Sequence, residues 1–338
     1  AMDRGKHVVT ANKKLIAMHG DTISRTATEH KVDFKFEASV AGGIPVIKAL
    51  REGLVANDVK FIFGILNGTD NYILTRMTEE NDTFDAALAE AQRLGFAESD
   101  PTLDIDGLDS AHKLQIIASL AFATWVPLDE IYVEGIRGLS AIDVQYATEM
   151  NYVIKLLAIV KQTENGAIDV RVHPTFIPTN YLLASVRHEF NAVYVRGDIV
   201  GTTLYYGKGA GRFPTASAVV ADLVDIGRDM VAGTVGHIPP FTINDAVRVL
   251  QIEDVECSFY MRFTTADAPG VLGKIASILG AHNVSIDSAI QKSIPDGRTT
   301  APIVLMTHKT RERDLRQAVQ DIDRLDCVSE PTVVFRVE

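Results

Sequence analysis

Residues 258–338 follow the order strand, helix, strand, strand, helix, strand, and few folds accommodate that order. The first strand, Ser258–Phe263, leads into Asp267-Ala-Pro-Gly, and the first helix, Val271–His282, leads into Asn283. Proline fixes φ and glycine lets the backbone approach closely, so this strand-to-helix turn favours a pocket for a small ligand. A ferredoxin-like interaction domain without a ligand has the same order of elements. The segment therefore predicts a compact terminal domain and leaves its ligand open.

The chain before this domain changes its pattern of elements twice. A strand at His7–Thr10, a helix to about residue 30 and a strand at Val32–Glu37 alternate as they do in an α/β sheet. From residue 38 to residue 206, glycine-rich turns separate helices and strands in an α+β arrangement. We expect helices near residues 44–53, 71–79, 84–94, 109–123 and 143–161, and strands near 59–66, 168–177, 190–196 and 199–206.

A second glycine-rich turn, Gly207-Lys-Gly-Ala-Gly211, follows a strand and precedes an apolar helical stretch at 216–231. Backbone N–H groups at such a helix start can face an anion or a cofactor. A flexible strand-to-helix turn without a ligand explains the glycines equally well. The turn alone leaves both interpretations open.

Length, charge and cysteine content limit the class of protein. With 338 residues, 46% of them hydrophobic, the chain is long enough for two or three domains. A net charge of −11 without a Lys/Arg cluster argues against nucleic acid, whose phosphates need a basic surface. Cys257 and Cys327 form no close-spaced pair, which is typical of free thiols in a reducing compartment. No apolar stretch is long enough to cross a bilayer, so we expect a cytoplasmic protein that acts on small molecules.

Residues 95–113 place five carboxylates in one loop and end on a lysine where an apolar helix begins. Asp109 and Lys113 are four residues apart and share a helix face, and Glu98 can approach from the loop. Carboxylates bind an ammonium group, and a partly desolvated lysine can exchange a proton with an alcohol or carbonyl oxygen. The pattern predicts a site for a small amino-acid-like substrate. An acidic loop that only caps a helix, with an exposed Asp–Lys pair, is the alternative.

Taken together, the motifs of this chain resemble those of homoserine dehydrogenase in its long form, which carries a C-terminal ACT domain. The resemblance covers nearly every residue. The motifs are Gly-Lys-His-Val-Val-Thr-Ala-Asn-Lys13, Glu37-Ala-Ser-Val-Ala-Gly-Gly-Ile-Pro45, Gly64-Ile-Leu-Asn-Gly-Thr-Asp-Asn-Tyr72, residues 95–113 and Gly209-Ala-Gly-Arg-Phe-Pro-Thr-Ala-Ser217. Each motif is weak alone, but the five in family order are specific.

The resemblance implies three parts. Residues 1–37, completed by 207–250, would be the remnant of a Rossmann-type NAD(P)-binding domain, and 38–206 an α+β domain for substrate binding, catalysis and dimerisation. Residues 258–338 would be the ferredoxin-like ACT domain. A complete nucleotide-binding domain opens with a strand, a Gly-x-Gly-x-x-Gly turn and a helix, and only six residues precede the first strand here. We therefore expect the chain to be a fragment of a longer protein.

The resemblance also implies a reaction, the NAD(P)H-dependent reduction of L-aspartate 4-semialdehyde to L-homoserine in threonine, methionine and isoleucine biosynthesis. By match to the family motifs, Lys113 would give the proton to the carbonyl oxygen, and Glu98 and Asp109 would hold the substrate. Lys13 would be the second catalytic lysine, beside the nicotinamide. The implied cofactor-binding residues are Lys13, Gly95, Gly209 and Gly211. The preference between NADP and NAD is not predicted.

A monovalent-cation site is implied at the second motif. There the family holds a sodium ion by oxygen atoms that correspond to Glu37, Val40, Gly42 and Ile44. Backbone carbonyls turned inward at a Gly-Gly bend suit a hard cation, although an empty strand-to-helix turn has the same sequence.

For the terminal domain the resemblance implies threonine as a feedback effector, bound by Asp267, Gly270, Asn283 and Ile286. It also implies a homodimer through the sheet of the substrate domain, with tetramers possible through the ACT domain. If the chain does not turn over alone, it would act as a non-catalytic amino-acid-binding and dimerisation module.

Two residues depart from the family pattern near the expected site. Asp70 stands where the family usually has threonine, and adds a charge on the substrate side. Lys208 stands where the family usually has proline, and loosens the glycine-rich turn that proline would stiffen.

Overall fold

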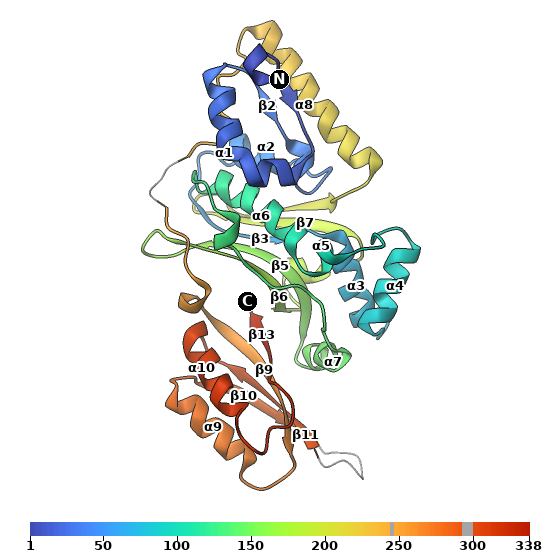
Figure 1. Cartoon of the computed structure of the whole chain (residues 1–338), viewed down its shortest axis with the longest axis vertical. Coiled ribbons are helices and arrows are strands. Elements are labelled where there is room, and N and C mark those ends of the chain that lie inside the picture. Colours follow the sequence, from blue (N-terminus) through green and yellow to red (C-terminus); the bar gives the residue numbers. More distant parts are fainter. Residues whose placement is uncertain (244–246, 293–299) are drawn as a thin grey trace. The chain divides into compact units, whose positions relative to one another are not determined.

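The computed structural model describes residues 1–243, 247–292 and 300–338. The chain forms two compact units (Figure 1). Unit 1 comprises Ala1–Ala141, Lys155–His173 and Asn180–Leu250. Unit 2 comprises Ile142–Ile154, Pro174–Thr179 and Gln251–Glu338. Two long strands, β5 (Tyr152–Gln162) and β6 (Ile168–Pro178), therefore contribute residues to both units.

The first elements of unit 1 are a strand–helix–strand repeat. β1 (Val8–Val9) and β2 (Phe34–Lys35) pair in parallel on either side of α1 (Lys13–Glu29), which confirms the predicted alternation. The side chain of Asn12 caps α1 by accepting a hydrogen bond from the N–H of Leu15. A long helix far along the chain, α8 (Arg212–Ala232), contacts β1, so this layer combines both ends of unit 1 (Figure 1).

The main sheet of unit 1 has the order β6-β5-β3-β7-β8. Its other strands are β3 (Val59–Ile65), β7 (Phe190–Gly197) and β8 (Gly201–Lys208), and the short β4 (Tyr132–Val133) pairs in parallel with β6. β3 pairs antiparallel with both β5 and β7. As the central strand it is buried from Ile62 to Ile65, and it delivers the chain directly into the candidate site at Leu66.

Helices cover this sheet and carry the polar residues of the site. They are α3 (Gly68–Glu79), α4 (Phe84–Arg93), α5 (Thr102–Ile105) and α6 (Leu108–Ala121). Their positions confirm the predicted helices, apart from the short α5, which was not expected. α6 contacts β3, and α3 contacts β7, because both helices bury apolar side chains against the sheet.

The helix predicted over residues 143–161 is wrong in its second half. α7 (Ala141–Glu149) ends early, Asn151 adopts a positive φ of 64°, and β5 begins at Tyr152. The run from Ile154 to Val160 is buried throughout, Lys155 included, so it lacks the alternation of a strand with one exposed face. Such a run cannot be told from a buried helix by periodicity.

Another short helical region starts the predicted cation motif. A 3-10 turn at Glu37–Ser39 is followed by α2 (Val46–Lys48), and Ala49–Gly53 continues as a wider helical turn. Positive φ angles at Ala41 (51°) and Gly42 (52°) reverse the chain between them. A β-carbon on Gly42 would overlap the carbonyl of Gly209, so the bend needs glycine there.

Unit 2 contains the predicted ferredoxin-like order. Its elements are β9 (Glu256–Ala266), α9 (Val271–Ala281), β10 (Ile286–Gln291), β11 (Thr300–Thr307), β12 (Thr310–Arg311), α10 (Glu312–Ile322) and β13 (Val333–Val337). The strands pair antiparallel in the order β10-β11-β9-β13. Phe259, Met261 and Phe263 alternate on one face of β9 and pack against both helices.

The α7 helix belongs to unit 2, where a buried ion pair attaches it to the sheet. Both carboxylate oxygens of Asp143 accept hydrogen bonds from Arg262, at 2.6 and 3.0 Å, and the hydroxyl of Tyr260 donates a third at 2.8 Å. The contact-based units do not separate residues 1–37 from 38–206, so that boundary stays a prediction. Within the described ranges, no helix is long and apolar enough to cross a membrane.

Candidate active site

Lys113 lies on α6, one turn after Asp109. Its ammonium group donates to Asp109 Oδ2 at 2.7 Å and to the carbonyl oxygen of Leu66 at 2.6 Å. The lysine side chain is only 11% exposed. The i,i+4 pair predicted from the sequence is therefore present, but it is a buried pair rather than an exposed one. The carbonyl at the end of β3 supplies the second acceptor that fixes the ammonium group.

Asp109 forms ion pairs with two lysines at once. Lys13, the first residue of α1, places its ammonium group 3.2 Å from Asp109 Oδ1, while Lys113 occupies Oδ2. Burial alone would raise the pKa of Asp109, but the charges of Lys113 and Lys13 and the hydrogen bonds to Lys113 and Asn67 lower it to about 2. Asp109 is therefore a permanent anion that joins residues from α1 and α6.

Asn67 is a polar residue of the site that sequence reasoning missed. Its Nδ2 group donates to Asp104 Oδ1 at 2.7 Å and to Asp109 Oδ2 at 2.9 Å, and its Oδ1 accepts from the N–H of Asp70 at 3.0 Å. One side chain thus caps α3 and binds two carboxylates through the same amide nitrogen. Burial raises the pKa of Asp104, against the hydrogen bond from Asn67. The Asn-Gly sequence after a buried strand was the only available signal.

These residues line one pocket with a volume of about 580 Å³. It contains six of the predicted residues, namely Lys13, Gly95, Glu98, Asp109, Lys113 and Gly211. It also contains Asn67, Gly68, Thr69, Asp104, Glu189, Lys208 and Arg212, which were not predicted as site residues. The acidic loop, the β3–α3 turn and the glycine-rich turn before α8 therefore meet at a single cavity.

Gly209 lies next to the lining but not in it. A β-carbon at this position would overlap the side chain of Asn191, whose Nδ2 group donates to the carbonyl of Leu66 at 2.9 Å. The glycine allows β8 to pass close to the same carbonyl that holds Lys113. Its predicted contact with the cofactor stays a prediction.

Part of the pocket lining suits an anionic group. α8 begins at Arg212 after Gly211, whose φ is +116°, and the first-turn N–H groups of this 21-residue helix form a partial positive charge. Lys13, Lys208 and Arg212 add three cationic side chains to the lining. The residues present therefore fit the phosphate-bearing part of a nicotinamide cofactor.

The predicted sodium residues lie together in the bend before α2. Both carboxylate oxygens of Glu37 accept backbone hydrogen bonds at 2.9 Å, from Ile47 and Lys48, so the side chain caps α2. The carbonyl of Ile44 accepts from the N–H of Val46 at 2.8 Å. Burial raises the pKa of Glu37 to about 7. The sodium site stays a prediction that rests on backbone carbonyls.

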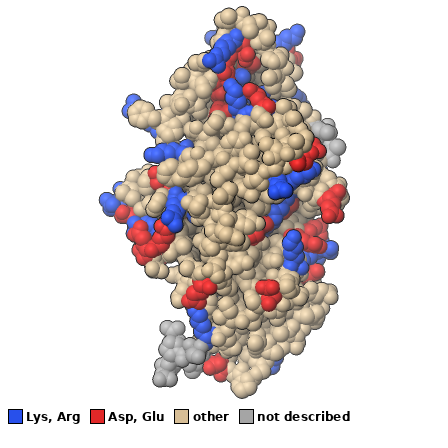
Figure 2. Space-filling view, turned by 180° about the vertical axis from the view of Figure 1, so that it is seen from behind, with Lys and Arg blue, Asp and Glu red and all other residues tan. Residues whose placement is uncertain are grey.

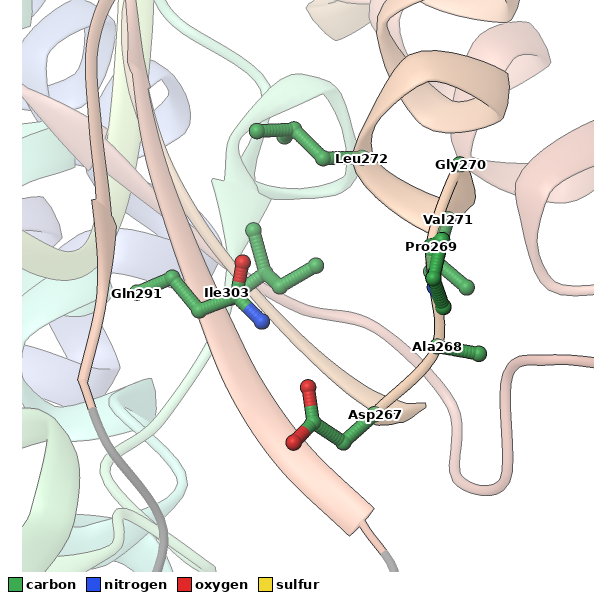
Figure 3. Close-up of a pocket in the computed structure, with 8 residues that line it drawn as sticks. All are labelled: Asp267, Ala268, Pro269, Gly270, Val271, Leu272, Gln291 and Ile303. Atoms are coloured by element: carbon green, nitrogen blue, oxygen red, sulfur yellow. The ribbon is translucent and has the colours of Figure 1, made fainter.

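A separate pocket of about 440 Å³ lies in unit 2. Asp267 and Gly270 line it, as predicted, together with Leu272, Gln291 and Ile303. In Figure 3 the Asp267 carboxylate and the Gln291 amide reach into the space between the sheet and the turn that precedes α9. Asn283 and Ile286 follow α9 and are not part of this lining, so the structure brings together only two of the four predicted residues.

Comparison with known proteins identifies the family of the chain. The family model of homoserine dehydrogenase matches residues 45–224, and that of the ACT domain matches residues 259–327. A homoserine dehydrogenase of Neisseria gonorrhoeae is 49% identical over 342 residues, which span all of this chain and 78% of that protein. The chain belongs to the homoserine dehydrogenase family. It is an NAD(P)-dependent oxidoreductase of amino-acid biosynthesis that reduces L-aspartate 4-semialdehyde to L-homoserine.

Solved structures of homoserine dehydrogenases show the same fold. The enzyme of Thiobacillus denitrificans superposes with a TM-score of 0.94 at 46% identity, over all of this chain and 77% of that one. A hyperthermophilic archaeal homoserine dehydrogenase mutant, in complex with NADPH, matches 68% of this chain and 66% of its own, with a TM-score of 0.59 at 32% identity. The family assignment thus rests on sequence and fold together.

Proposed function

We propose that Lys113 is the proton donor to the aldehyde oxygen during reduction and the proton acceptor during oxidation of the alcohol. The observation that carries this role is its ammonium group, which is held between Asp109 and the Leu66 carbonyl at the wall of the pocket. A positive group at a fixed position stabilises the negative charge that develops on the oxygen as hydride arrives. When bound, a nicotinamide cofactor supplies that hydride.

The substrate's ammonium group is held by the carboxylates of the same pocket. Asp104 and Glu98 both line it, and neither carboxylate has a lysine or arginine partner among the ion pairs of the described residues. Asp109, by contrast, is already shared by two lysines. We therefore assign Asp104 and Glu98 to the ammonium group, and Asp109 to the alignment of Lys113 and Lys13.

The cationic part of the lining binds the cofactor. Lys13, Arg212 and the start of α8 suit the cofactor's phosphate groups, and the archaeal relative in complex with NADPH supports the phosphorylated cofactor for this chain as well. Cys257 and Cys327 are both thiols, which supports a cytoplasmic setting for the reaction.

The test is NADPH oxidation with aspartate semialdehyde by the chain and by Lys113→Ala. General acid catalysis typically contributes about 10²–10⁴-fold, so kcat/KM should fall by about that factor. Lys14→Ala is the matched control, because Lys14 is an exposed neighbour of Lys13 that does not line the pocket. Equal turnover by Lys113→Ala and the unaltered chain would refute the assignment.

We further propose that the pocket of unit 2 binds threonine as an effector. A carboxylate and an amide beside the apolar side chains of Leu272 and Ile303 suit a small amino acid with a short side chain. L-Threonine should raise the melting temperature of the chain, and Asp267→Ala should abolish the shift. No shift with millimolar L-threonine in the unaltered chain would rule the effector out.

A homodimer through the sheet of unit 1 is supported by a half-buried aromatic ladder. Phe61 stacks on Phe63 and Tyr194, at centroid distances of 4.8 and 6.0 Å, and Lys161 lies 5.2 Å from the Phe63 ring. Figure 2 shows a wide area with few charged side chains on one face of the molecule, and the basic side chains there are interspersed with acidic ones. Sedimentation equilibrium should give twice the monomer mass, and a monomer mass would refute the dimer.

A further inference from the structure

Asp70 is a buried carboxyl group that the proposed mechanism does not use. It lies in the first turn of α3, next to Gly68 and Thr69 of the pocket lining, and its residue exposure is 1%. Among the described residues, neither of its carboxyl oxygens has a hydrogen-bond partner, although its backbone N–H is capped by Asn67. Few native groups are left in this state without a reason.

The charges that face Asp70 come from two other elements. Asp104 lies on α5, Asp106 at the end of α5, and Asp109 and Lys113 on α6. The Asn67 side chain that accepts from the backbone N–H of Asp70 also donates to the carboxylates of Asp104 and Asp109, so no amide hydrogen is left for the Asp70 carboxyl group. Burial raises the pKa of Asp70 well above its usual range, the charges of Asp104 and Asp109 raise it further, and Lys113 opposes them.

An ionised Asp70 would leave a buried charge with no donor beside two other carboxylates. The desolvation of an unpaired carboxylate is unfavourable enough that such groups take up a proton instead. The neutral form adds no further negative charge to a group of neighbours in which Asp104, Asp106 and Asp109 already outnumber Lys113. The geometry of the empty site therefore favours a carboxylic acid at this position.

We propose that Asp70 is a positioning residue of the ammonium-binding site that carries a proton in the empty site and releases it to the buffer when the substrate's ammonium group binds. The inference rests on the proposed function, because Asp104 and Glu98 must bring that positive charge into the pocket. The added cation stabilises the Asp70 carboxylate, and the proton passes to solvent without any change in bonding to the substrate. By linkage, substrate affinity then rises with pH through the titration of Asp70.

The residue usual in the family supplies the contrast. Threonine at this position has a hydroxyl group that does not titrate in the working range of pH. Asp70→Thr and Asp70→Asn both keep a small polar side chain and lose the proton. This chain should therefore differ from both variants in the pH dependence of substrate binding.

The experiment is calorimetric titration of L-homoserine into the full chain with NADPH present, so that no hydride transfer can occur. Heats measured at one pH in buffers of different ionisation enthalpy give the number of protons released. Wild type should release part of one proton on binding, and Asp70→Asn and Asp70→Thr should release less. Asp100→Asn is the matched control, because it removes a charge from an exposed part of the same acidic loop and should behave as wild type.

The outcomes separate the two proposals. No heat of homoserine binding in wild type would count against the proposed function itself. Binding with the same proton count in wild type and in both Asp70 variants would overturn the role of Asp70. The wild-type affinity should rise with pH relative to that of both variants, because only the wild type loses the Asp70 proton on binding. Melting curves establish whether each variant is folded. If Asp70→Asn does not fold, Asp70→Thr is used for the comparison.

Discussion

Two buried carboxylates of unit 1, one in the pocket and one in the bend before α2, have pKa values that are shifted in opposite directions. Asp109 forms ion pairs with two lysine ammonium groups, and its pKa is lowered to about 2. Glu37 accepts from two backbone N–H groups and lies near Asp222, and burial raises its pKa to about 7. Both side chains are almost fully buried. The difference shows that the charge of the donor, rather than the number of hydrogen bonds, decides whether a buried carboxylate stays ionised.

Asp109→Asn tests the pocket half of this comparison and should have the largest effect. The substitution leaves the Lys113 ammonium group with only a carbonyl acceptor and releases Lys13. We expect kcat/KM to fall by about 10²-fold or more and the free energy of unfolding to fall by roughly 3 kcal/mol, as for a buried pair that loses one partner. Steady-state kinetics and urea denaturation measure the two effects. Unchanged kinetics would show that the function of Lys13 and Lys113 does not depend on the Asp109 carboxylate.

Asn67→Ala removes the amide that links the carboxylates without removing any charge. Asp104 and Asp109 lose their shared donor, and α3 loses its cap. KM for the semialdehyde should rise by roughly tenfold, and stability should fall by about 1–2 kcal/mol, the typical contribution of a helix cap. A change in kcat alone, with KM unaltered, would contradict a role of the bridge in substrate binding.

Glu37→Gln tests the second carboxylate of this comparison through the pH dependence of the stability. The folded pKa of Glu37, about 7, lies above the model-peptide value of 4.5, so the folded state holds this proton more tightly than the unfolded state. Its contribution to stability is complete below pH 4.5, is lost as pH rises to about 7, and does not change above that. Wild type should therefore lose roughly 3 kcal/mol relative to Glu37→Gln over this window. Parallel melting-temperature profiles of the two proteins would contradict the shift.

Sodium binding tests the surroundings of Glu37 further and should have the smallest effect on stability. If carbonyls of Val40, Gly42 and Ile44 hold the ion, sodium chloride should stabilise the chain relative to choline chloride of equal ionic strength. The gain is about 1 kcal/mol when sodium is roughly fourfold above its dissociation constant. The cation should also lower the pKa of Glu37, because a positive charge favours the carboxylate. Identical melting temperatures in the two salts would rule out the sodium site.

Local patterns in the sequence predicted most elements and part of the site. The spacing of Asp109 and Lys113 determines their contact, because a helix places residues four apart on one face. The order of elements in unit 2 was likewise evident, since alternating apolar residues and a Pro-Gly turn mark each boundary. Where the sequence failed, at residues 152–161, the mostly apolar run shows no regular alternation, and the positive φ of Asn151, just after α7, is set by the fold.

The remaining site residues depend on long-range packing. Asn67 and Glu189 reach the pocket from segments far apart in the chain, and nothing in their neighbouring residues indicates that they meet. Asp104 could not be chosen among the five carboxylates of its loop, because the short α5 that orients it has no clear periodicity. Asp70 was noticed as a departure from the family pattern, but its isolation from hydrogen-bond donors is a property of the folded interior alone.

The carbonyl of Leu66 accepts from Lys113 on one side and from Asn191 on the other. Leu66 directly follows β3, which is paired with strands on both edges, so this oxygen is among the least displaceable atoms of unit 1. The Lys113 nitrogen is therefore anchored to the sheet rather than to a surface loop. A change in a surface loop can then alter the outline of the pocket while the position of this nitrogen stays fixed.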